Sequence, residues 1–91
     1  MNAETRVKIL DRARFQLPTD TIVDYLIEES AELIHALSKW KRGKSSSIEK
    51  IEEEMADVSI MLELAKGTVV SEGKVTKQVE KKLKRLRRRT K

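Results

Sequence analysis

The sequence predicts an all-α protein, a compact antiparallel bundle of about four helices. Its 91 residues include one proline and three glycines, and the composition favours helix formers. Apolar residues recur at helical spacing between these breaks, and the linkers are short and polar. We therefore expect residues 1–91 to form a single domain. Because so short a chain buries a small core, we expect dimerisation to complete the bundle.

The first helix is expected from about Ala3 to Phe15, with Asn2 as its N-cap. Its apolar stripe is thin and consists of Val7, Leu10 and Ala13. Pro18 then breaks the chain, because proline cannot continue a helix. Thr19 or Asp20 is the expected N-cap of the next helix.

The two central helices are the strongest predictions of secondary structure. The first of them is expected from about Asp20 to Arg42, with Gly43 at its C′ position. The segment Ser46–Glu49 matches a capping box, which predicts the start of another helix from about Ser47 to Lys66. Gly67 ends that helix.

The last helix is expected from about Lys74 to Arg89, after a break at Gly73. Its apolar stripe consists of Val75, Val79, Leu83 and Leu86. The preceding residues, Thr68–Val70, are too few for a strand without a partner. We expect them to form a connection that packs into the core.

Charge divides the chain into an acidic body and a basic tail. Residues 74–91 carry ten basic residues and one acid, whereas residues 1–73 carry ten basic and fourteen acidic residues. Such asymmetry is typical of contact with nucleic acid or phosphate, or of a solvated helix face. No apolar run is long enough to span a bilayer, no secretory segment is evident, and there is no cysteine. We expect a cytoplasmic protein without membrane contact.

Four acidic residues lie where apolar residues would be expected. On a helical wheel, Glu29 lies within about 40° of Leu33, inside the apolar arc of its helix. Glu32 lies at the edge of that arc, whereas Glu28 lies about 100° from Glu29. In the next helix, Glu54 and Asp57 also fall among apolar positions.

Carboxylates in an apolar arc cost several kcal/mol unless they are paired or bind a metal ion. Neither arc contains a lysine or arginine. Glu29 with Glu32, and Glu54 with Asp57, are pairs three residues apart, so each pair shares one helix face. Oxygen ligands without cysteine predict Mg²⁺, with Mn²⁺ as a second possibility. The competing interpretation is a set of partly exposed acids paired with the basic tail.

The segments EESAELIHALSKWKRG and IEEEMADVSIMLE carry the pattern EExxE followed by ExxD. Over residues 20–66 the chain resembles the MazG-like all-α nucleoside triphosphate pyrophosphohydrolases. The resemblance implies one MazG-like domain with a basic C-terminal helix, Mg²⁺-dependent cleavage between the α and β phosphates of a nucleoside triphosphate, and a homodimer or higher oligomer. It implies a catalytic set of five acids, four of them metal ligands: Glu29, Glu32, Glu54 and Asp57. Glu28 matches the remaining motif position, and its role stays open between a second ion and the attacking water.

Cations are needed to complete a phosphate site. The candidates lie at the end of the first acidic helix and in the basic tail: Lys39, Lys41, Arg42, Lys77, Lys81 and Lys84. Each is also explained as a surface charge, or as a cation that complements a helix dipole. Trp40 is expected in the core or in a dimer contact.

Three other functions compete with hydrolysis. Glu32 and His35 form an ExxH, as in di-iron bundles, but the second acidic helix has no histidine and His35 lies toward the polar side. The basic tail is compatible with a nucleic-acid-binding protein, although aromatic residues are scarce. A helical module that binds a basic partner is the third. Only the enzyme predicts that Mg²⁺ raises the melting temperature and that Glu54→Gln or Asp57→Asn removes this effect.

Overall fold

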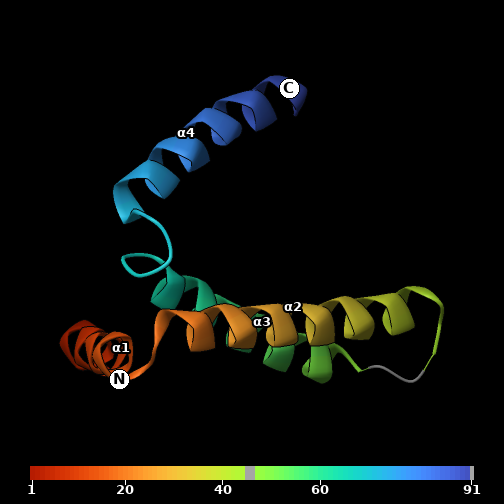
Figure 1. Cartoon of the computed structure of the whole chain (residues 1–91). Helices are drawn as coiled ribbons and strands as arrows, with labels where there is room; N and C mark the ends of the chain where they lie inside the picture. Colours follow the sequence, from red (N-terminus) through yellow and green to blue (C-terminus); the bar gives the residue numbers. More distant parts are fainter. Residues whose placement is uncertain (45–46, 91) are drawn as a thin grey trace.

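The computed structural model describes residues 1–44 and 47–90. They form four helices: α1 (Ala3–Gln16), α2 (Thr19–Lys41), α3 (Ile48–Ala65) and α4 (Glu72–Arg89) (Figure 1). In these two ranges, one isolated bridge between Lys66 and Val70 is the only β-type pairing. The all-α prediction and the number of helices are confirmed.

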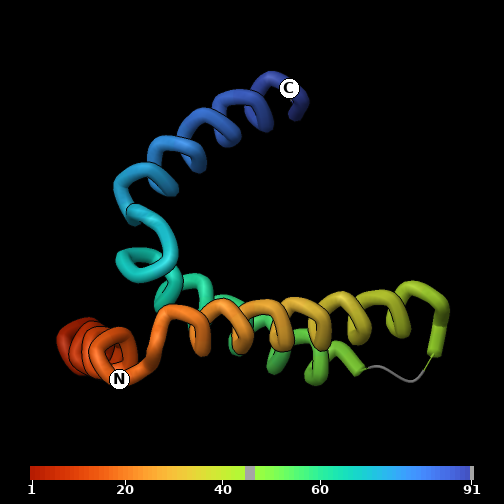
Figure 2. The backbone as a smooth tube through the Cα atoms, viewed as in Figure 1, coloured from red at the N-terminus to blue at the C-terminus, as the bar shows by residue number. Residues whose placement is uncertain are grey.

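Helices α2 and α3 run antiparallel and form the centre of the molecule (Figures 1 and 2). Their facing sides bury the apolar residues Ile22, Ala36, Ile51, Met61, Leu64 and Ala65. Leu10 and Ala13 of α1 pack against this small core from one end. The two helices that carry the acidic motif are therefore held side by side over much of their length.

Arg14 attaches α1 to the end of α3. Its Nε donates to the Lys66 carbonyl at 3.1 Å, and its Nη2 donates to the Glu63 carbonyl at 2.6 Å. The last carbonyls of a helix have no partner within it, and a cation there also complements the helix dipole. Arg14 therefore acts as a tertiary cap for α3.

The helix starts show where local signals were sufficient. The Asn2 side chain accepts a hydrogen bond from the Thr5 backbone N–H at 2.8 Å, as predicted. The predicted side-chain cap of α2 is wrong, because Pro18 is the N-cap and makes no side-chain hydrogen bond. Ser47 caps α3 by accepting from the Lys50 N–H at 3.1 Å, whereas the predicted capping box began one residue earlier, at residue 46. Residue 46 lies outside the described ranges.

The connection between α3 and α4 differs from the prediction in two respects. Gly67 has a φ of 87° and ends α3 as expected. Val69 and Val70, however, are 41% and 46% exposed, so this segment does not pack into the core. Gly73 does not interrupt the chain, because α4 begins at Glu72 with Ser71 as its N-cap. The Ser71 hydroxyl accepts from the Lys74 N–H at 3.4 Å, which outweighs the weak helix propensity of one glycine.

Helix α4 projects away from the other three helices (Figures 1 and 2). None of its described residues comes close to the backbone of α1, α2 or α3. The predicted stripe is therefore uncovered, with Val79, Leu83 and Leu86 about half exposed. The radius of gyration is 15.7 Å, larger than the roughly 12 Å typical of a globule of this length. No helix of the described chain is long and apolar enough to cross a membrane.

Candidate metal centre

The antiparallel pairing of α2 and α3 brings three acids together. Glu29 lies near the middle of α2, and Glu54 and Asp57 lie one turn apart on the facing side of α3. One carboxylate oxygen from each residue lies within 4.8 Å of those of the other two. Oxygens at this separation can share one divalent cation. We call Glu29, Glu54 and Asp57 the acidic cluster.

Burial makes the acidic cluster costly without a cation. Glu54 is only 2% exposed, and Glu29 and Asp57 are partly buried. Glu54 Oε2 and Glu29 Oε2 are both shielded from solvent and have no hydrogen-bond partner. An unpaired buried polar atom carries its full desolvation penalty. Two such oxygens beside a third carboxylate fit the ligand preferences of a hard divalent ion.

The pKa values of the carboxyl groups reflect the same cost of bringing these acids together. Burial raises the pKa of the Glu29 carboxyl above its ordinary value. The negative charges of Glu32, Asp57 and Glu54 raise that pKa further, in this order. The pKa of Glu32 is also raised, first by the close approach of its carboxyl group to that of Glu54 and then by the Glu54 charge. Without a cation, the carboxylates resist being ionised together.

One lysine partly offsets this repulsion, and the wheel analysis missed it. Lys50 Nζ lies 2.8 Å from Glu54 Oε1. This hydrogen bond lowers the pKa of Glu54, against the opposing effect of burial. Lys50 lies outside the apolar arc, but its long side chain reaches the carboxylate from one turn away. The i, i+4 spacing of Lys50 and Glu54 was the available signal.

The two other motif acids lie outside the acidic cluster. Glu32 is exposed, yet it is close enough to Glu54 for their carboxyls to interact. Glu28 is exposed and belongs to no group of converging acids in the part of the chain that the structure describes. The structure thus separates the five motif acids into three that converge, one at their edge and one outside.

A cavity of about 420 Å³, lined by both polar and apolar residues, opens beside the acidic cluster. It lies between the second half of α2 and the start of α3, and its lining residues are Ala31, Glu32, His35, Ala36, Lys39, Ser47, Lys50 and Glu54. Glu54 belongs to both the cavity lining and the cluster, so the two adjoin each other, although Glu29 and Asp57 do not line the cavity. Lys39 and Lys50 bring two cations to the cavity wall.

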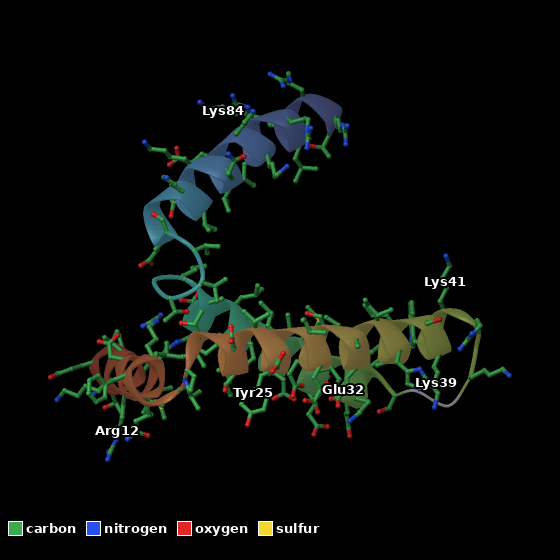
Figure 3. The ribbon with its side chains drawn as sticks, viewed as in Figure 1. Arg12, Tyr25, Glu32, Lys39, Lys41 and Lys84 are labelled. Carbon is green, nitrogen blue, oxygen red and sulfur yellow. The ribbon has the colours of Figure 1, made fainter. Side chains whose placement is uncertain are left out.

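The other cations predicted to bind phosphate are not gathered at this cavity. Figure 3 shows Lys39 projecting to the same side of α2 as Glu32, whereas Lys41 projects to the opposite side. Arg42 follows α2 and is exposed. Lys77, Lys81 and Lys84 are exposed on α4, away from the α2–α3 pair. Trp40 is 53% exposed and is not a core residue of the single chain.

The protein is thus an all-α protein in which the antiparallel pair α2 and α3 carries inward-facing carboxylates, and these form a candidate metal site. A family model for the MazG nucleotide pyrophosphohydrolase domain matches residues 18–91. The chain therefore belongs to the MazG nucleotide pyrophosphohydrolase domain family. The match covers α2, α3 and α4 and leaves out α1. Searches of curated proteins and of solved structures returned no match.

Proposed function

We propose that the protein is a Mg²⁺-dependent nucleoside triphosphate pyrophosphohydrolase. It would cleave an NTP or dNTP between the α and β phosphates and release a monophosphate and pyrophosphate. The observation that carries this proposal is the acidic cluster, whose oxygens lie within 4.8 Å of one another and include two without partners. The family match supports the same class of substrate.

The metal-binding roles follow from the position of each carboxylate. Glu29, Glu54 and Asp57 would hold Mg²⁺, or Mn²⁺ in its place, and Glu32 would supply a further oxygen from the edge of the cluster. A bound divalent ion neutralises polyphosphate charge and acidifies coordinated water. Glu28 remains a predicted catalytic residue on the strength of the motif alone.

The cavity gives the polyphosphate a place next to the cluster. Its cations, Lys39 and Lys50, would hold phosphate oxygens and orient the chain relative to the carboxylates. The other predicted cations contribute less to phosphate binding in a single chain, since none of them lines this cavity: Lys41, Arg42, Lys77 and Lys81. A second subunit whose α4 reached the cavity would bring Lys77 and Lys81 closer, and we propose a homodimer or higher homo-oligomer.

The test is a panel of ribo- and deoxynucleoside triphosphates, including modified bases, incubated with Mg²⁺. We expect release of pyrophosphate and monophosphate in equal amounts from at least one nucleotide. Glu54→Gln should reduce the rate by at least about a hundredfold, because it weakens the most buried ligand. Glu52→Gln, an exposed neighbour on α3, is the matched control and should keep the wild-type rate.

Two results would overturn the proposal. One is the absence of pyrophosphate release from every nucleotide by a folded protein that binds Mg²⁺. The other is equal activity of Glu54→Gln and Glu52→Gln. Release of orthophosphate in place of pyrophosphate would place the cleaved bond elsewhere in the polyphosphate.

A further inference from the structure

Lys50 is paired with a buried carboxylate although most of its own side chain is exposed. Its ammonium forms a 2.8 Å ion pair with Glu54, a carboxylate that is almost fully buried. Its own side chain is nevertheless 53% exposed, so little packing holds it in place. A lysine side chain has a flexible four-carbon stem and a compact charge. Lys50 can therefore leave Glu54 without disturbing the core.

The ion pair competes directly with a divalent ion for the same carboxylate. Glu54 has Oε1 paired with Lys50 and Oε2 unpartnered and buried. A divalent ion held by the acidic cluster would stand close to the ammonium, and like charges repel strongly at short range away from bulk water. The ammonium therefore has to weaken or abandon its contact when the metal binds.

The cavity provides the alternative position for the ammonium. Lys50 and Glu54 both line it, and Lys39 stands on the same wall. A polyphosphate in this space would offer anionic oxygens within reach of the Lys50 stem. The Lys50 ammonium, once released from Glu54, would then pair with phosphate. The metal ion would neutralise Glu54, so no buried charge would lack a partner.

Building on the proposed function, we propose that Lys50 is an exchangeable counter-cation that holds Glu54 in the metal-free protein and contacts the nucleotide polyphosphate once a divalent ion is bound. Lys50 is then a substrate-positioning residue that also links the two ligands. Metal binding releases it, and the nucleotide gives it a new partner. Each ligand therefore favours the binding of the other.

The test measures metal and nucleotide binding separately from turnover. Calorimetric titration of Mn²⁺ into the nucleotide-free protein should show tighter binding to Lys50→Met than to the wild type, by roughly fivefold, because a competing cation is gone. In saturating Mn²⁺, binding of an α,β-methylene nucleoside triphosphate should weaken by a similar factor. Opposite changes in the two affinities are the signature of exchange.

Two variants control for other effects of the substitution. Lys8 and Glu4 form a similar i, i+4 pair on α1, with 3.4 Å between Nζ and Oε1, so Lys8→Met should change neither affinity. Lys50→Arg keeps the positive charge. Its affinities for Mn²⁺ and for the nucleotide analogue should therefore be close to those of the wild type. Helical circular dichroism confirms that each variant is folded before titration.

A lower Mn²⁺ affinity of Lys50→Met would overturn the proposal, because it would mean that Lys50 only orients Glu54 for the metal. Unchanged affinities, or absence of Mn²⁺ binding to both proteins, would overturn it as well. A protein that shows the opposite changes but hydrolyses no nucleotide would disprove the proposed function and leave the exchange role of Lys50 intact.

Discussion

At the scale of single residues, the site is governed by a conflict between burial and charge at Glu54. This residue is the only charged one among the buried residues of the described chain. Lys50 neutralises one of its oxygens, and the other oxygen stays without a partner. A buried carboxylate in this state is expensive, so we expect the fold to be stabilised by a divalent cation.

Glu29 makes this cost dependent on pH. Its pKa in the folded protein is raised above 4.5, first by burial and then by the neighbouring carboxylates. The folded state therefore keeps a proton that the unfolded state has already lost. In metal-free protein, the stability should fall as the pH rises from about 4.5 through the raised pKa.

Thermal melts in a chelator across this pH range provide the measurement. The fall in melting temperature should be smaller for Glu29→Gln, which cannot ionise, and smaller for the wild type in Mg²⁺. A wild-type profile parallel to that of Glu29→Gln would contradict the prediction. Asp24→Asn is a suitable control, because Asp24 is exposed on the same helix.

At the scale of helices, the important feature is how each one is tied to its neighbours. Helices α2 and α3 are held by a buried apolar seam, whereas α1 depends on a few contacts at the end of α3. Arg14 provides the polar part of that attachment by donating to two carbonyls. Helix α1 lies outside the residues that the family model matches, and Arg14 joins it to the matched part of the chain.

Arg14→Ala should loosen α1 and expose the end of the core. Loss of two charge-assisted hydrogen bonds to backbone carbonyls is expected to cost about 2 kcal/mol. Urea denaturation measures this change in the free energy of unfolding. Arg12→Ala, at an exposed position on the same helix (Figure 3), should change it by less than about 0.5 kcal/mol. Equal effects of the two substitutions would contradict the role given to Arg14.

At the scale of the whole molecule, α4 is the feature that the single chain does not explain. Its apolar stripe and its basic residues are both exposed. The acidic α2–α3 pair of the same chain does not pack against them. Exposed apolar stripes of this kind are typical of interaction sites. We interpret α4 as the element through which the proposed oligomer forms.

Removing the stripe should therefore prevent self-association. In the double variant Leu83→Gln with Leu86→Gln, we expect a monomer in sedimentation velocity at concentrations where the wild type is oligomeric. The matched control replaces the adjacent cations, Lys84→Gln with Arg87→Gln, and should retain the oligomer. A wild-type protein that stays monomeric at all concentrations would contradict this assignment of α4.

The sequence determined those features that depend on local chemistry. The four helices, the Asn2 cap and the glycines that follow α2 and α3 could be predicted because propensity and capping act over a few residues. The wheel also identified Glu29, Glu54 and Asp57 as inward-facing, since burial follows from the face of the helix that each residue occupies.

Only the tertiary structure decided how those residues meet. The register of α2 against α3 determines that three acids converge while Glu32 stays at the edge and Glu28 outside, and no local signal specifies a register. Lys50 reaches Glu54 because a long side chain can cross from an exposed face to a buried one, which a wheel does not represent. The uncovered stripe of α4 was predicted as apolar, but whether a stripe finds a partner within its own chain depends on how the whole chain packs.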